Sequence, residues 1–174
     1  MREKTNSNNL GRAAAYLITY RCYGTWLHGD ARGSVDRQHN VPGTALVDLD
    51  SERQCQAQRQ LRHLPVNLNA TCRSVLEKAI RDVCAHRNWT LHAIAVRTNH
   101  VHVVVTTNTS PELAMNSFKS WGTRALLTQR LIQPGTKLWT RHGSTRYIWK
   151  AESIEAACEY VMQGQGCNLP LQDW

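Results

Sequence analysis

Residues 95–106 read Ala95-Val96-Arg97-Thr98-Asn99-His100-Val101-His102-Val103-Val104-Val105-Thr106, and this stretch decides the fold. β-branched residues dominate it and Gly and Pro are absent, so it predicts a strand. Side chains alternate along a strand, which places His100 and His102 on one face and the intervening valines on the core face. Two neighbouring imidazoles on a rigid strand suit a divalent metal. The alternative is a solvent-facing polar edge without a ligand.

The length and charge of the chain narrow its class. At 174 residues it is long enough for one domain with its own core. It carries 21 Lys and Arg against 13 Asp and Glu, a formal net charge of +8. An excess of this size favours a polyanionic partner, of which nucleic acid is the usual one. A mildly basic soluble protein without such a partner is the alternative.

Cysteine usage points to a reducing compartment. The six cysteines form no Cys-x-x-Cys pair, and no signal peptide or long apolar run is evident. These features predict a cytoplasmic chain with reduced thiols and no membrane span, associated with the nucleoid when bound to DNA. Cys84 and Cys158 fall on apolar helix faces and are expected in the core.

The elements follow from periodicity and from helix-capping signals. Strands are expected over 13–23 and 89–96, followed by the histidine strand, and helices over 51–62, 69–87 and 152–164. A further helix begins at Ser110-Pro111-Glu112, with an apolar stripe formed by Ala114, Phe118, Trp121 and Ala125. Residues 137–149 predict one strand, or a hairpin that bends at Gly143-Ser144.

This order predicts an α+β fold of the ferredoxin-like type, a split βαβ pair. In this fold an antiparallel sheet carries helices on one face, and an additional C-terminal helix follows. The opposite face stays open, with the histidine pair on it or at its rim. A disordered leader is expected over 1–12, one domain over 13–166 with an insertion at 24–68, and a tail over 167–174.

The last helix supplies a candidate nucleophile. Tyr160 lies off the apolar stripe of that helix, with Gln163 and Gln165 nearby in the chain. A metal held by two histidines needs further oxygen ligands, and a side-chain amide is one choice. A tyrosine hydroxyl beside a metal-polarised phosphate can attack it and leave a covalent phosphotyrosine.

These residues resemble a known family. Residues 98–105 resemble the His-hydrophobic-His (HUH) motif of single-tyrosine transposases of the insertion-sequence and REP-associated types, and residues 160–165 resemble their nucleophile helix. The resemblance spans about residues 13–166. The motif order differs from that of conjugative relaxases, although Tyr16, Tyr20 and Tyr23 keep the relaxase order open.

The resemblance implies a metal-dependent endonuclease and strand transferase, a transposase. His100 and His102 would bind Mg²⁺ or Mn²⁺. Tyr160 would attack a single-stranded DNA phosphate, leaving a 5′-phosphotyrosine and a free 3′-hydroxyl. The resemblance also implies a homodimer, in which the tyrosine helix of one subunit can complete the other's site, and recognition of DNA hairpins beside the cut.

One departure from the family pattern concerns the third metal ligand. The family usually has Gln or Asn four residues after the tyrosine, and Gly164 occupies that place here. Either Gln163 turns into the site, or a bulge at Gly164 brings Gln165 into place, since such bulges often occur at functional sites. The glycine makes a bulge easy, which favours Gln165.

Further residues are candidates for DNA contact. Trp26 in the loop after the first strand can stack on an unpaired base while arginines hold phosphates; a loop packed down by its Trp is the alternative. Lys119 and Arg124 lie on the helix after the histidine strand, and a surface role in solubility is the alternative for each. The candidates are Trp26, Arg32, Arg37, Lys119, Arg124, Arg141 and Arg146.

Two other functions compete. A phosphodiesterase with two His-x-Ser/Thr motifs would use His142-Gly143-Ser144, but the pair at 100–102 does not fit that pattern. A non-catalytic ferredoxin-like nucleic-acid-binding module, including a transposase relic, would stack bases on its open sheet face. Such a module wants aromatic residues on the middle strands, where this chain places His100, His102 and Val104.

Overall fold

The computed structural model describes residues 13–27, 29–30 and 50–163. The leader expected over 1–12 and the tail expected over 167–174 lie outside these ranges. In chain order the described elements are β1 (Ala15–Cys22), α1 (Ser51–Arg59), α2 (Ala70–His86), β2 (Thr90–Val96), β3 (His100–Thr106), α3 (Pro111–Thr128), β4 (Trp139–Ile148) and α4 (Ser153–Gln163).

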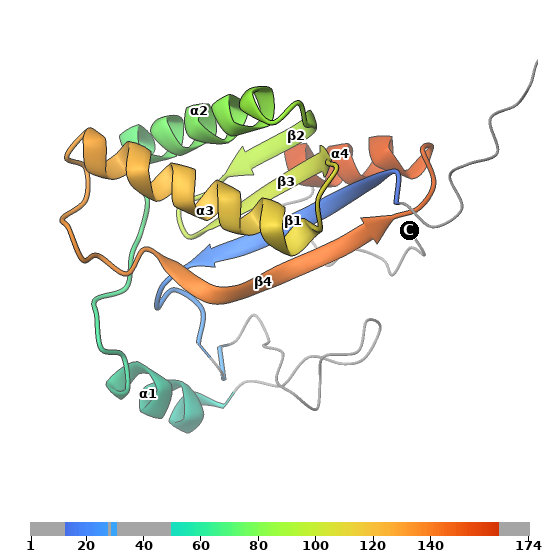
Figure 1. Ribbon diagram of the computed structural model, residues 1–174. Coiled ribbons are helices and arrows are strands. Elements are labelled where there is room, and N and C mark those ends of the chain that lie inside the picture. Colours follow the sequence, from blue (N-terminus) through green and yellow to red (C-terminus); the bar gives the residue numbers. More distant parts are fainter. Residues whose placement is uncertain (1–12, 28, 31–49, 164–174) are drawn as a thin grey trace, which may run out of the picture.

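The strands form one antiparallel sheet in the order β2-β3-β1-β4. The histidine strand β3 is therefore central, and β2 and β4 are the edges. β2 and β3 form a hairpin, while α2 and α3 cross over between strands (Figure 1). This is the predicted ferredoxin-like arrangement, and it is confirmed.

Side-chain caps fix where the long helices begin. Asn69 accepts a hydrogen bond from the Cys72 backbone N–H at 2.8 Å, and Ser110 accepts one from the Leu113 N–H at 3.3 Å. Each satisfies a backbone donor that the first turn leaves without a helical partner. Pro111 follows as the first residue of α3, where its missing N–H costs nothing.

The main core lies between the sheet and the two crossover helices. Val101, Val103 and Val105 are fully buried there against Ile80 of α2 and Phe118 of α3. Both helices lie over the same face of the sheet (Figure 1). The valine face predicted from the alternation in β3 is thus the face that the helices cover.

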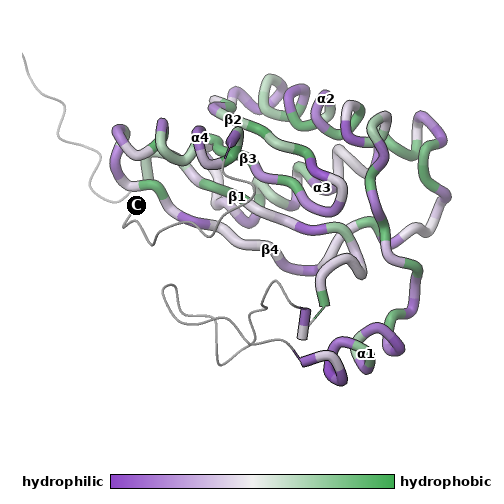
Figure 2. The backbone as a smooth tube through the Cα atoms, turned by 180° about the vertical axis from the view of Figure 1, so that it is seen from behind, coloured by the Kyte–Doolittle hydropathy of each residue, from purple (hydrophilic) through white to green (hydrophobic). Residues whose placement is uncertain are grey.

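The opposite face is not fully open, because α4 crosses it. Ala157 and Val161 of α4 pack against Leu17 and Val104. Figure 2, from behind, shows α4 on the side of the sheet away from α2 and α3. The expectation of an uncovered second face is wrong for this part of the sheet, since the expected C-terminal helix fills it.

β4 is one continuous strand, so the expected alternative of a hairpin with a bend at Gly143-Ser144 is wrong. The glycine has a packing role instead. A Cβ atom built at Gly143 would lie 2.5 Å from the Met115 sulfur and 2.5 Å from the Thr19 carbonyl oxygen. Only a residue without a side chain allows the edge strand to approach β1 and α3 this closely.

The buried stripe of α3 differs from the predicted one. Ala114 and Phe118 are buried as predicted, but Trp121 and Ala125 are only partly buried. Gly122 and Leu126 occupy the contact instead. A Cβ at Gly122 would lie 2.6 Å from a Leu76 methyl of α2, so the glycine lets the two helices approach closely.

The segment predicted as an insertion contains α1, which has no buried residue and lies apart from the sheet (Figures 1 and 2). Cys84 is buried as predicted and Cys158 is half-buried beside the second core. The cysteines among the described residues are free thiols. No helix in the described part of the chain is long and apolar enough to cross a membrane.

Candidate functional site

The two histidines share a face of the sheet, as predicted. In the strand register His102 pairs with Thr19 of β1 and Ala95 of β2, and His100 pairs with Arg21. The two imidazole centres lie 4.7 Å apart at an interplanar angle of 81°. His102 is only 6% exposed and His100 is half-buried. The alternative of a solvent-facing polar edge is therefore wrong for His102.

Each imidazole is held through its Nδ1 atom. His102 Nδ1 lies 2.7 Å from the Thr19 hydroxyl oxygen, and His100 Nδ1 lies 2.7 Å from the Asn99 amide oxygen. An imidazole that donates from Nδ1 carries its lone pair on Nε2, the form that a metal ligand needs. Side-chain partners of this kind are typical of histidines that bind metals.

The separation of the rings also suits a shared cation. A metal about 2.1 Å from each Nε2 lies roughly 3.3 Å from each ring centre, so two imidazoles that subtend a right angle at the metal have centres roughly 4.6 Å apart. The observed separation of 4.7 Å is compatible with this value. Residues 13–27, 29–30 and 50–163 contain no group of three or more His, Cys, Asp or Glu suited to a metal.

Tyr160 of α4 lies beside the histidine pair. Its ring centre lies 5.7 Å from that of His102, with an interplanar angle of 71°. The position follows from the packing of α4, because burial of Ala157 and Val161 against the sheet directs the partly buried Tyr160 toward the histidines. His102 and Tyr160, which are 58 residues apart in the chain, thus lie side by side.

Gln163 and Gln165 are the two candidates for the third ligand. Gln163 is exposed at the last residue of α4. Gln165 lies outside the described residues, as does the glycine before it. The choice between the two amides stays a prediction.

A cation and an aromatic ring adjoin the His100 side of the site. The Arg21 guanidinium stacks over the Trp26 ring, with its central carbon 3.4 Å from the ring centre. Thr25 anchors this loop through hydrogen bonds to the carbonyls of Cys22 and Asn99, at 3.0 and 3.4 Å. The loop candidate Trp26 therefore lies beside the histidine hairpin. Arg32 and Arg37 lie outside the described residues.

Lys119 and Arg124 lie on α3, on the far side of the sheet from the histidines. Lys119 is 8% exposed, and its ammonium donates to the carbonyls of Thr140, Arg141 and His142 at 3.1, 3.3 and 3.4 Å. Burial lowers the pKa of this lysine. The alternative of a surface residue that serves solubility is wrong for Lys119, whose ammonium fastens α3 to β4.

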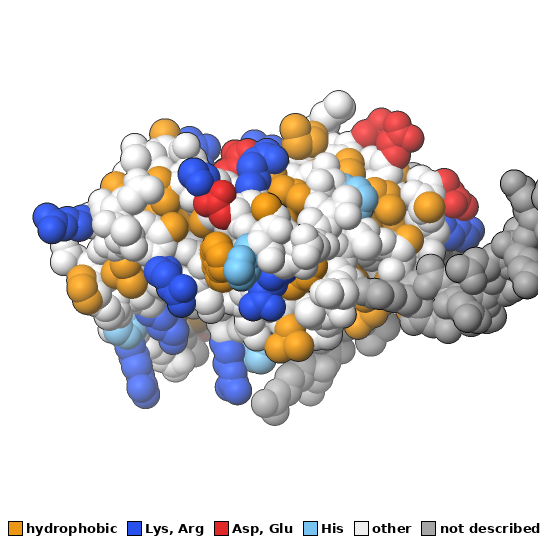
Figure 3. All heavy atoms as spheres, turned by 45° about the horizontal axis from the view of Figure 1, so that its top comes forward, with side chains coloured by type: hydrophobic (Ala, Val, Ile, Leu, Met, Phe, Trp, Pro, Cys, Tyr) orange, Lys and Arg blue, Asp and Glu red, His pale blue; other side chains and the backbone are white. Residues whose placement is uncertain are grey.

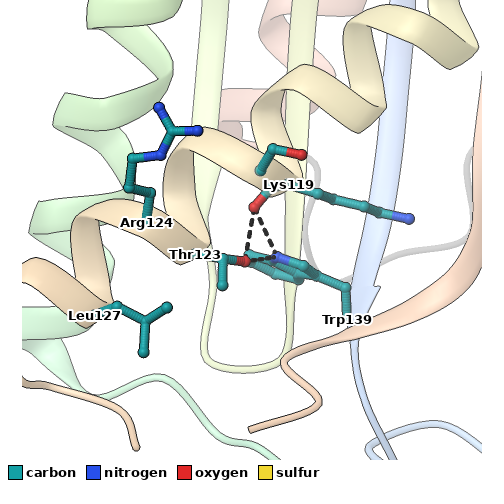
Figure 4. A pocket seen from close by; sticks show the side chains of 6 residues that line it. Lys119, Thr123, Arg124, Leu127 and Trp139 are labelled. Atoms are coloured by element: carbon teal, nitrogen blue, oxygen red, sulfur yellow. Dashed lines mark hydrogen bonds between the residues drawn. The ribbon is translucent and has the colours of Figure 1, made fainter. Parts of the chain in front are cut away.

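A shallow hollow beside Lys119 is also remote from the histidines. It is lined by Ser120, Thr123, Arg124, Leu127 and Trp139, as well as Lys119 (Figure 4). The Trp139 indole N–H donates to the Lys119 carbonyl and the Thr123 hydroxyl at 3.2 and 3.0 Å. Arg124 is exposed at this rim.

The other two arginine candidates lie on the edge strand. Arg141 is exposed and Arg146 is half-buried. Arg146 pairs with Leu17 in the register, on the same face as the histidines. His142 and Ser144 are exposed on the same strand.

Three residues of this site escaped the sequence prediction. Thr19 and Arg21 alternate with the core residues of β1, but only the pairing of β1 with β3 brings them to the histidines. Asn99 belongs to the HUH-like stretch 98–105, but the sequence analysis assigns it no role. The alternation of side chains along β1 predicts which residues share a face, but it does not predict how β1 pairs with β3.

Comparison with known proteins places the chain in a family. A family model described as "Transposase IS200 like" matches residues 63–164. A solved REP-associated tyrosine transposase bound to a REP hairpin is similar, with a TM-score of 0.52 and 14% sequence identity over 94% of this chain and 74% of that one. A candidate transposase from Deinococcus radiodurans R1 aligns with a TM-score of 0.43 and 14% identity, over 97% of this chain and 100% of that one.

No curated protein matches the chain in sequence. The structural similarity to the REP-associated protein, at this low identity, supports the shared fold. The family match is independent of it, covers more than half of the chain and includes both the histidine strand and α4. The chain therefore belongs to the IS200-like transposase family.

Proposed function

We propose that this transposase is a metal-dependent single-stranded DNA endonuclease and strand transferase that acts through Tyr160. The observation that carries the proposal is the meeting of the Tyr160 ring with His102, 5.7 Å between centres, beside a second histidine. A nucleophile next to a candidate metal site is the arrangement that phosphoryl transfer needs.

The reaction follows from the chemistry of the tyrosine. The Tyr160 phenolic oxygen loses its proton and attacks the phosphorus atom of a DNA phosphodiester. A bond forms between that oxygen and phosphorus, the bond from phosphorus to the 3′ oxygen breaks, and the 3′ oxygen takes up a proton. The products are a 5′-phosphotyrosine and a free 3′-hydroxyl. Attack by a 3′-hydroxyl on the phosphotyrosine reverses these bonds and joins the strands.

His100 and His102 would hold Mg²⁺ or Mn²⁺, and Gln165 or Gln163 would add an amide oxygen. When bound, the ion supplies positive charge to the phosphoryl oxygens. Thr19 and Asn99 hold the two imidazoles through their Nδ1 atoms, which fixes the ring orientations before any ligand arrives.

DNA contacts are proposed on the same side of the sheet. Trp26 would stack on an unpaired base, with Arg21 against its other face, and Arg146 would meet phosphates along β4. Arg32, Arg37 and Arg141 are further candidates, and Arg124 is a candidate on the opposite side of the sheet. The net charge of +8 favours contact with DNA. Figure 3 shows the side of α2 and α3, away from the histidines, where Lys and Arg side chains lie among a few acidic ones. A hairpin in the DNA and a homodimer are proposed from the family resemblance.

A single gel experiment tests the nucleophile. The full chain is mixed with Mn²⁺ and labelled single-stranded oligonucleotides that contain hairpins from the DNA beside its own gene. We expect a protein–DNA adduct that survives denaturing electrophoresis and disappears with EDTA or in Tyr160→Phe. Tyr23→Phe is the matched control, since this tyrosine belongs to the relaxase-like alternative.

The outcomes separate the competing functions. An adduct that persists in Tyr160→Phe and is lost in Tyr23→Phe would move the nucleophile to the N-terminal region. Tight DNA binding without an adduct under any divalent metal would instead favour the non-catalytic binding module.

A further inference from the structure

The edge strand β4 and its flanks carry an unusual composition. Residues 137–151 contain Lys137, Arg141, Arg146 and Lys150, and no Asp or Glu. Within the described sheet β4 pairs with β1 and is an edge strand. The Glu112 carboxylate of α3 accepts a hydrogen bond from the Thr145 hydroxyl at 2.8 Å, and Glu152 follows beyond the segment. The positive charge of residues 137–151 favours a polyanionic partner.

An exposed aromatic pair ends this strand. Tyr147 is 42% exposed and Trp149 is 54% exposed, yet their rings are stacked, with centres 5.5 Å apart and an interplanar angle of 22°. The buried Tyr16 ring contacts Tyr147 edge-on at 5.1 Å and 83°. Tyr16 thus supports the Tyr147 ring, while a large part of the apolar surface of the pair remains exposed.

We propose that Tyr147 and Trp149 form a stacking platform for an unpaired base of single-stranded DNA. This proposal rests on the proposed function, because it takes the DNA substrate of the transposase as the occupant. Unpaired bases offer flat apolar surfaces to aromatic rings, and the phosphates would meet Lys150 beside the pair and Arg146 on the histidine face of the strand. A duplex keeps its bases inside its own stack, so the platform selects unpaired strands.

The platform lies close to the candidate site along the strand. Ser144 pairs with Thr19, which holds His102, and Tyr147 lies three residues further, about 10 Å along β4. Tyr147 faces the side of Tyr16, whereas Thr19 and the histidines face the other side. A strand of DNA would therefore pass around the free edge of β4 between the platform and the histidines.

The test measures binding without chemistry. In a Tyr160→Phe background with EDTA, fluorescence anisotropy gives the affinity for a labelled mixed-sequence single-stranded oligonucleotide and for its duplex. We expect Trp149→Ala to weaken single-strand binding about tenfold, Trp149→Phe to restore most of it, and duplex binding to change less than about twofold. Leu64→Ala is the matched control, since Leu64 is 87% exposed but remote in sequence from β4.

A second measurement locates the base directly. Photocrosslinking with 5-iododeoxyuridine at successive positions, followed by mass spectrometry, should label Tyr147 or Trp149. Cross-links confined to other segments, or single-strand affinity unchanged in Trp149→Ala, would overturn the proposal. Neither readout uses the Tyr160 hydroxyl, so the platform can be confirmed even if another residue is the nucleophile.

Discussion

The hydrogen bond between Thr19 and His102 offers a quantitative test of the metal site. Thr19→Val keeps the β-branched shape of the side chain and removes its hydroxyl, which lies 2.7 Å from His102 Nδ1. Because His102 is 6% exposed, water has little access to replace the lost partner. Leaving a buried polar atom unsatisfied costs about 1–3 kcal/mol.

The expected loss of metal affinity has a similar magnitude. Loss of a partner that orients a ligating histidine lowers metal affinity by about 10–100-fold. We therefore expect Thr19→Val to bind Mn²⁺ at least about tenfold more weakly than the wild-type protein. Isothermal titration calorimetry with Mn²⁺ measures this directly, without DNA and without turnover.

The chain contains a matched control. Thr106 of β3 also bonds a histidine ring, with its hydroxyl oxygen 2.9 Å from His92 Nε2. Thr106→Val breaks a threonine–histidine contact in the same sheet but away from the histidine pair, so Mn²⁺ affinity should remain at the wild-type value. If Thr19→Val also binds Mn²⁺ as the wild type does, His102 is not a ligand held by Thr19 and the reasoning fails.

Two further predictions concern stability. Gly143→Ala should lower the free energy of unfolding by about 1–3 kcal/mol, because its Cβ would meet the Thr19 carbonyl oxygen at 2.5 Å; urea denaturation measures this, and equal midpoints for Gly143→Ala and the exposed-site control Ser144→Ala would contradict it. Burial raises the pKa of the Cys22 thiol from 9.0 to about 12. The unfolded chain loses this proton first, so stability should fall as pH rises from about 9 toward 12. Urea midpoints across that range should fall less steeply in Cys22→Ala, and parallel slopes would count against this assignment.

Much of the fold followed from local patterns. The alternation in residues 100–106 placed the valines and the histidines on opposite faces, and the capping residues Asn69 and Ser110 marked two helix starts. These features depend on neighbours in the chain, which a sequence displays directly. Tyr160 was expected off the apolar stripe of its helix, but it packs, partly buried, beside the second core with Ile154 and Cys158.

What could not be predicted depends on distant contacts. Thr19 meets His102 across 83 residues, and strand alternation alone does not give that register. Lysine is usually a surface residue, yet Lys119 is buried and its ammonium donates to three carbonyls of β4. Gly143 has the signature of a bend, but serves a close approach between elements that are separate in sequence.

The attachment of α4 has a kinetic consequence. The histidines belong to a central strand bonded on both sides, whereas Ala157 and Val161 are the only fully buried side chains of α4. Burial of these two small side chains stabilises the docked helix by about 2–4 kcal/mol, and the partly buried Ile154, Cys158 and Tyr160 add to this. Local opening of α4 is therefore much less costly than opening the sheet. In the proposed reaction the 5′ end of the cut DNA is bonded to Tyr160, so this end would move with α4 while the histidine strand stays folded.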